Sequence, residues 1–264
     1  MSFAEASAVS GGAGSWTAEI EEGWDIFGIS NGGYLMSVAT RAMEAESGGR
    51  RLISVTGHYL NPADAGPVAV SVDVLKTGRS LSMLRASLSR DDRPLVVVTG
   101  VLADPGRPLP EDELILGGPP ELPPPEACVM AEPSTTAPLP PPFTGKVDVR
   151  IHPEDASALV GQRSGSPVMR GWFRLRDGEA LDAHAVVMAT DAFPPAIFNS
   201  SLPVGWTPTI DLTVQVRDPA PSGWLACRFS TRFVTDGLLE EDGELWSEDG
   251  RPVALSRQLA LVPR

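Results

Sequence analysis

The stretch HAVVMATDAFPPAIF, residues 184–198, places a single carboxylate, Asp191, in an otherwise apolar run. Burying an unpaired carboxylate costs several kcal/mol or shifts its pKa. Asp191 therefore caps a helical turn, faces water, or does chemistry as a base. Two prolines, Pro194 and Pro195, follow closely and predict that a helix through this run ends there.

A second stretch that could do chemistry is GISNG, residues 28–32, which fits the G-x-S-x-G pattern of a nucleophile elbow. It would make Ser30 the nucleophile of an α/β serine hydrolase, with His184 or His152 as its base. Only 29 residues precede Ser30, too few for the strands and the oxyanion loop that normally come first. The segments that follow do not alternate between strand and helix, so this interpretation is the weaker one.

Composition limits the partners of the chain. Its net charge is −13 and no short segment clusters Lys or Arg, which argues against nucleic acid and anionic membrane surfaces. Cys128 and Cys227 are far apart and the histidines are scattered, so neither a disulfide framework nor a metal site is expected. The N-terminus does not resemble a signal peptide, and no apolar run reaches the ~20 residues of a membrane span. We expect a cytoplasmic protein without metal or cofactor.

Proline divides the chain into two units. Thirteen of the 26 prolines lie between Asp104 and Gly145, and this composition predicts an extended Pro-rich linker over residues 106–145. The linker separates an N-terminal unit, residues 1–105, from a C-terminal unit, residues 146–264.

The two units share one plan. Each has a strand, then an apolar helical segment, then four β-type segments with turn signals between them. The last hairpins match closely, SRDDRPLVVVTGVLA against SEDGRPVALSRQLAL, with the Arg-Pro pairs in register. A strand, a helix and an antiparallel meander, repeated once, predict an α+β fold.

This arrangement resembles the hotdog fold used twice, and the chain is similar to the double-hotdog acyl-CoA thioesterases of type II. The phrases SNGGYLMSVATRA and GHYLNPADAGPVAVSVDVLKTGRSLSMLRASL carry the resemblance in the first half. It implies two antiparallel sheets, each wrapping a long central helix, joined into one continuous sheet. It also implies hydrolysis of acyl-CoA to fatty acid and CoA, and assembly into a homodimer or higher homo-oligomer.

The resemblance also implies a catalytic set. Type II members use an Asp on the second-half helix, a Thr before the following strand and a Gln in the last strand. The matching residues are Asp191 in MATDAF, Thr209 in TPTIDLTV and Gln258 in LSRQLALV. Asp191 would be the general base, and Thr209 and Gln258 would hold the same water. Gly100 stands at the position of Gln258 in the first half, so one site per pair of halves is expected; His58 also falls at a family position.

Substrate contacts can be proposed as well. In SNGG, at the start of the first helix, Gly32 and Gly33 would let a substrate approach backbone N–H groups that could receive the oxyanion. Lys76, Arg79 and Arg85 are candidates for binding the CoA phosphates, although each also fits as an ordinary surface charge.

Two alternatives stay open within the same fold. The chain could bind acyl-CoA or acyl chains without hydrolysing them. A dehydratase would need a His paired with an acid on the helix, and His184 lies seven residues before Asp191.

Overall fold

The computed structural model describes residues 1–104, 113–133, 140–203 and 205–262. The strands of the first half are β1 (Ser10–Gly12), β2 (Ser15–Ile20), β3 (Asp25–Ile26), β4 (Ile29–Ser30), β5 (Arg51–Tyr59), β6 (Gly66–Thr77), β7 (Leu81–Arg90) and β8 (Arg93–Ala103). Those that follow are β9 (Val129–Met130), β10 (Val147–Ile151), β11 (Val168–Leu175), β12 (Thr209–Val216), β13 (Leu225–Ser230), β14 (Val234–Thr235), β15 (Leu238–Ser247) and β16 (Pro252–Leu261). The α-helices are α1 (Phe3–Ala6), α2 (Gly32–Glu46), α3 (Pro153–Ala156) and α4 (Ala183–Ala189), and the 3₁₀ helices are η1 (Pro125–Ala127), η2 (Pro142–Gly145), η3 (Ser157–Val160) and η4 (Ala196–Asn199).

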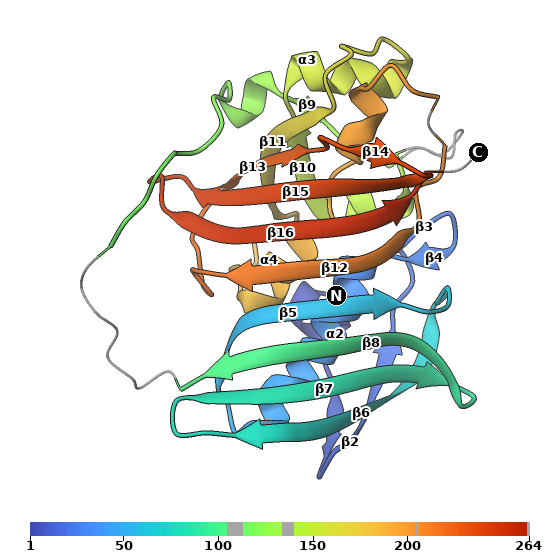
Figure 1. The fold of residues 1–264 in the computed structure, drawn as a ribbon, viewed down its shortest axis with the longest axis vertical. Coiled ribbons are helices and arrows are strands. Elements are labelled where there is room, and N and C mark those ends of the chain that lie inside the picture. The colour runs from blue at the N-terminus through green and yellow to red at the C-terminus, as the bar shows by residue number, and fades with distance from the viewer. Residues whose placement is uncertain (105–112, 134–139, 204, 263–264) are drawn as a thin grey trace.

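Almost all strands belong to one antiparallel sheet (Figure 1), in the order β1-β2-β6-β7-β8-β5-β12-β16-β15-β13-β11-β10-β9. The halves meet where β5 pairs with β12, with Val55 opposite Val214. On each side of this junction the strand order repeats, since β5, β8, β7, β6 and β2 correspond to β12, β16, β15, β13 and β11. The two halves thus form one continuous sheet, as the resemblance implies, and not two separate sheets.

The predicted meander strands form where apolar and polar residues alternate, because alternate side chains of a strand point to opposite faces. The DDRP segment of the first matched hairpin forms the turn that joins β7 to β8, and both Asp91 and Asp92 have positive φ there. Two successive residues with positive φ are typical of the two-residue turn that fits the twist of a hairpin.

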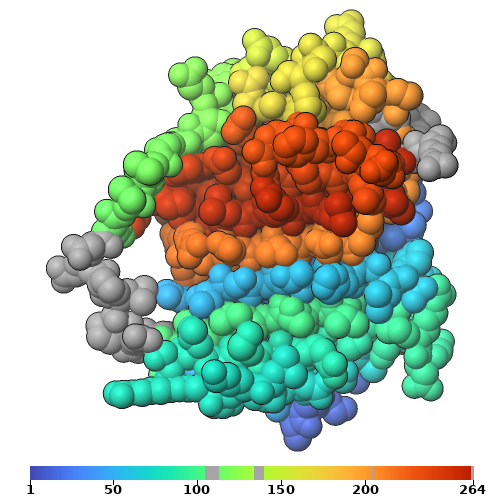
Figure 2. All heavy atoms as spheres, viewed as in Figure 1, coloured from blue at the N-terminus to red at the C-terminus, as the bar shows by residue number. Residues whose placement is uncertain are grey.

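Helix α2 packs against the inner face of the first-half strands, whereas none of the helices in the described residues covers the face of the sheet turned to the viewer in Figures 1 and 2. Its side chains are buried over most of its circumference, including Tyr34, Met36, Val38 and Met43 at 0% exposure. Burying one such large apolar side chain stabilises the fold by about 1.5–3 kcal/mol. Among the helices of the described ranges, none is both long enough and apolar enough to cross a membrane.

The expectation of a long central helix in each half is wrong for the second half, because α4 has only seven residues. The carbonyls of Thr190 and Asp191 would need N–H donors from Pro194 and Pro195, four residues later, and proline has none. The chain instead turns away after Ala189 and resumes as η4.

Part of the predicted linker packs on the second half. Within it, β9 pairs with β10, and Pro123 accepts a hydrogen bond of 2.8 Å from the indole N–H of Trp172. Glu113 forms a 2.8 Å ion pair with Arg251. The described residues of this segment therefore extend the second-half sheet and lie against it.

Candidate active site

Asp191 lies just beyond the end of α4, against the N-terminus of α2. The side-chain amide of Asn31 donates to the backbone carbonyl of Asp191 at 2.8 Å and to its carboxylate Oδ2 at 3.1 Å. The backbone N–H of Gly33 donates to the same Oδ2 at 2.9 Å. A residue of the second half is thus held by the first turn of a helix from the first half.

Local sequence explains why these groups meet. Asn31 is the N-cap of α2, where its Oδ1 accepts from the N–H of Tyr34 at 2.9 Å, which leaves its NH₂ free for Asp191. The carbonyl of Asp191 is available because its helical partner would be Pro195. Gly33 allows the close approach: a Cβ there would lie 3.0 Å from both the Cβ of Asp191 and the Cα of Met188.

The environment of Asp191 raises the pKa of its carboxyl group. Burial raises its pKa to about 6, against the opposing effect of hydrogen bonds from Gly33, Gly32 and Asn31. A carboxylate with a pKa near 6 is ionised at neutral pH and accepts a proton more readily than an ordinary aspartate.

Thr209 and Gln258 form a second polar pair on the inner face of the sheet. Gln258 is buried, and its Nε2 donates to Oγ1 of Thr209 at 2.8 Å. This hydrogen bond leaves the Gln258 carbonyl oxygen as an acceptor and the Thr209 hydroxyl proton as a donor. Neither residue is directly hydrogen-bonded to Asp191 among the residues described.

Glu241 is a further buried acid near both groups and was missed by the sequence analysis. It stands directly opposite Gln258 in the ladder of β15 and β16, and its Oε2 accepts a 2.5 Å hydrogen bond from the N–H of Ala196. Burial raises its pKa to about 7, the Ala196 N–H opposes that rise, and the charge of Asp191 adds to it. Alternation in LLEEDGELW, with Leu239 on the same face, is the signal that could have placed it inward.

Tyr59 is a further residue that the sequence analysis did not assign to the site. The hydroxyl of Tyr59 is buried and has no hydrogen-bond partner within the described ranges. It lies beside the helix start, 2.8 Å from where a Cβ on Gly32 would be. Burial raises its pKa well above the usual value, and the charges of Asp191 and Asp211 add to that rise.

The remaining predicted residues lie elsewhere or are otherwise engaged. The N–H of Gly33, expected to face an oxyanion, donates to Asp191, and the ring of Tyr59 packs on Gly32. Gly100 lies under the side chain of Met43. His58 is exposed and stands opposite Asp211, on the outer face of the sheet.

The three cations proposed for CoA do not converge on Asp191. Lys76 and Arg79 are exposed at the β6–β7 hairpin, which lies level with Arg51 at the start of β5. Tyr59 and the site are at the other end of β5, about 25 Å away at ~3.3 Å per residue. Arg85 is exposed and forms a 2.6 Å ion pair with Asp73.

The described residues contain no assembled catalytic triad of the kind that the serine hydrolase alternative requires. Ser30 is 6% exposed, and neither histidine contacts it among the described contacts. Both ring nitrogens of His184 are engaged, Nδ1 with the Thr40 hydroxyl at 2.8 Å and Nε2 with the Glu44 carboxylate at 3.1 Å. The ring of His152 accepts from a backbone N–H at the start of α3.

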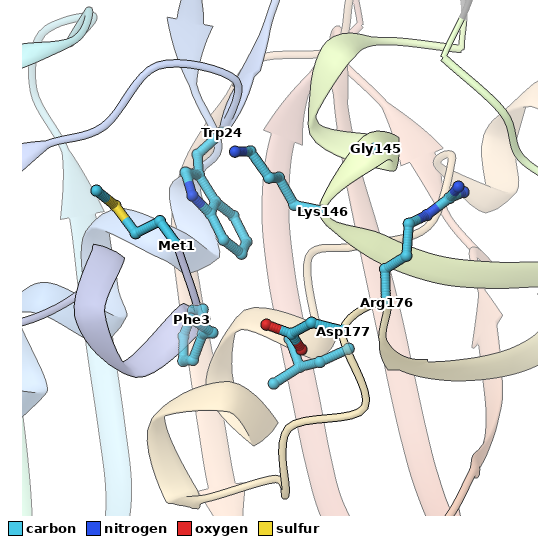
Figure 3. A pocket seen from close by; sticks show the side chains of 8 residues that line it. Met1, Phe3, Trp24, Gly145, Lys146, Arg176 and Asp177 are labelled. Atoms are coloured by element: carbon cyan, nitrogen blue, oxygen red, sulfur yellow. The ribbon is translucent and has the colours of Figure 1, made fainter.

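Other polar features lie apart from Asp191. A cavity of about 280 Å³ is lined by Trp24 of the first half and Lys146 of the second, with Phe3 and Asp177 (Figure 3). His152 forms a cluster of possible metal ligands with two neighbouring acids, Glu154 and Asp155. The guanidinium of Arg170 bonds both of these carboxylates at 2.9–3.1 Å, so the cluster functions as an ion-pair network. Cys128 and Cys227 are free and buried.

Comparison with protein families matches both halves. Residues 20–103 match the model of the acyl-CoA thioesterase N-terminal domain, and residues 120–262 match the model of the acyl-CoA thioesterase C-terminal domain. An uncharacterised protein of Mycobacterium tuberculosis is 26% identical over 267 residues, covering 93% of this chain and 90% of its own length.

Solved structures share the whole fold. A candidate thioesterase II from Thermobifida fusca superposes with a TM-score of 0.87 at 32% identity, covering 99% of this chain and 97% of its own. A protein of unknown function with a hot dog fold from Alicyclobacillus acidocaldarius gives 0.84 at 20% identity, covering 99% and 98%. The acyl-CoA thioesterase II TesB2 of Mycobacterium marinum gives 0.72 at 16% identity, also covering 99% and 98%.

Proposed function

Because the chain belongs to the acyl-CoA thioesterase family, we propose that it hydrolyses acyl-CoA thioesters to a carboxylic acid and CoA by means of Asp191, Thr209 and Gln258. The observation that carries this proposal is the Asp191 carboxylate itself. It is fixed by Asn31 and Gly33, and its pKa of about 6 suits it to take a proton from water at neutral pH.

In this mechanism a water molecule attacks the thioester carbonyl carbon. Asp191 takes one proton of the water as the new C–O bond forms, and the carbonyl oxygen becomes an oxyanion. The Gln258 carbonyl oxygen and the Thr209 hydroxyl, left free by their mutual hydrogen bond, orient that water. Collapse of the tetrahedral intermediate breaks the C–S bond, and the proton passes from Asp191 to the leaving thiolate.

Proton transfer and orientation of the water contribute separately to the rate of hydrolysis. General base catalysis contributes typically 10²–10⁴-fold in rate, which is the effect assigned to Asp191. Misplacing reacting atoms by about 1 Å can cost ~10²-fold, which is the effect assigned to the Thr209–Gln258 pair. The mechanism needs no covalent acyl-enzyme.

The experiment is release of free CoA, followed by thiol titration, from acyl-CoAs of short to long chain. Wild type is compared with Asp191→Asn, and Asp73→Asn is the control, since Asp73 is an exposed acid paired with Arg85. Turnover that falls at least ~10²-fold in D191N and persists in D73N supports the proposal. Turnover that survives D191N contradicts the assigned base. Binding of acyl-CoA without release at any chain length would make the protein a binding module.

A further inference from the structure

Glu241 is a buried acid without a cation. The residue is 8% exposed, and none of the ion pairs among the described residues includes it. Its neighbour Glu240 lies on the opposite face of β15 and pairs with Arg232 at 3.7 Å. A carboxylate withdrawn from water without a counter-ion destabilises the fold, so the presence of an acid at this position needs an explanation.

The contacts of Glu241 place it between the two parts of the site. Across the ladder it faces Gln258, and paired residues of an antiparallel ladder project to the same face. Its Oε2 accepts the N–H of Ala196, which directly follows Pro194 and Pro195. Because neither proline has an N–H, Ala196 supplies the first backbone donor after the two prolines, and this donor ties the bend to β15.

The two acids influence one another's charge. Asp191, with its donors, loses its proton first, near pH 6, and its negative charge helps to keep Glu241 protonated up to about pH 7, where burial is the larger cause of the raised pKa. Two interacting carboxyl groups of this kind release their protons in two steps that belong to the pair. Between these steps the pair holds one proton and one negative charge.

Resting on the proposed hydrolysis, we propose that Glu241 is a positioning residue that works in its protonated form. One oxygen accepts from the Ala196 N–H and so fixes the bend that carries Asp191. The proton on the other oxygen keeps Glu241 neutral, so that no second negative charge lies near Asp191 and Gln258. When Glu241 ionises, repulsion between the two carboxylates displaces Asp191 from its working position.

The pH profile of kcat/KM tests this role. Wild type is expected to show a bell, rising with a group near pH 6 and falling with one near pH 7. Glu241→Gln retains a carbonyl acceptor for Ala196 and is neutral at every pH, so its falling limb should disappear while the rising limb remains. Glu241→Leu removes the acceptor, so kcat should fall ~10- to 100-fold at all pH values with KM unchanged. Glu244→Gln is the matched control and should keep the wild-type bell, because Glu244 is another acid of β15, paired with Arg228 at 3.8 Å, whose charge does not contribute to the raised pKa of Glu241.

A second readout needs no substrate. An acid whose pKa is raised in the folded state loses stability as the pH rises from its unfolded to its folded pKa. The melting temperature of E241Q, relative to wild type, should therefore increase between about pH 5 and pH 7 and stay constant above. The E244Q control should show no such increase.

The outcomes separate the two proposals. If wild type releases no CoA but E241Q shows the predicted melting behaviour, the hydrolysis proposal fails while the charge state of Glu241 stands. If D191N abolishes turnover yet E241Q has the wild-type bell and melting curve, the role of Glu241 is overturned. Full kcat in a folded E241L would overturn the anchoring role in the same way.

Discussion

Asn31 and Asp191 are joined across the two halves of the chain by one amide group. The side-chain NH₂ of Asn31 donates to both the backbone carbonyl and the carboxylate of Asp191, while the side-chain oxygen Oδ1 of Asn31 caps helix α2. The capping residue of the first-half helix is thus also the residue that orients the second-half acid. Each half alone has only part of this arrangement, which is a physical reason for joining two similar units into one sheet.

Asn31→Asp should move the acidic limb of the pH profile to higher pH. Aspartate is as good an N-cap as asparagine, so α2 is retained, but a carboxylate replaces the amide donor beside Asp191. Like charges raise the pKa of each other, so Asp191 should ionise only above its present value of about 6. The measurement is kcat/KM against pH, with Asn31→Ser as a neutral capping control. An unchanged limb in N31D would show that Asp191 is not the titrating base.

Gly33→Ala should reduce both stability and turnover, although alanine favours helix over glycine by about 1 kcal/mol. The new Cβ would lie 3.0 Å from the Cβ of Asp191 and from the backbone of Met188. Overpacking of this kind costs typically ~1–3 kcal/mol. If the structure relieves the crowding, Asp191 moves away from its present position. Thermal unfolding and kcat are the measurements. Gly12→Ala, where a Cβ meets no atom within 4 Å, is the control, and a G33A protein as active as G12A would contradict the packing argument.

The sequence predicts those features that depend on local pattern. Alternation along β12 and β16 and the turn residues Asp91 and Asp92 are local, so the meanders and their hairpins follow from the sequence. The prolines Pro194 and Pro195 are a local signal for the end of α4, but the contact that holds Asp191 there was not predictable in the same way, because Asn31 is 160 residues away. Glu241 escaped notice because its significance depends on its distant neighbours and not on its own segment.

Asp191→Asn should stabilise the folded protein above pH 6. The pKa of Asp191 is raised from 3.8 to about 6, so the folded state prefers the protonated acid. Stability from this group is present below its unfolded pKa and is lost as the pH rises through 6. Asparagine is neutral throughout, so D191N should gain up to about 3 kcal/mol over wild type at pH 8 and little at pH 4. Urea unfolding at both pH values is the measurement. Equal stability of D191N and wild type at pH 8 would mean that the ionised Asp191 carboxylate does not destabilise the folded protein.

Tyr59→Phe should leave the protein as stable as wild type or more stable. The Tyr59 hydroxyl is buried with no partner among the described residues, and an unsatisfied buried polar group costs about 1–3 kcal/mol. Tyr34→Phe is the matched control, because the Tyr34 hydroxyl donates to the Ala6 carbonyl at 2.6 Å and accepts from the Glu21 N–H at 3.1 Å. Its removal leaves partners unsatisfied and should lower the melting temperature, by about 2–4 °C for each kcal/mol lost. Thermal unfolding of both variants decides the point. If Y59F melts below wild type, the Tyr59 hydroxyl has a stabilising partner in solution.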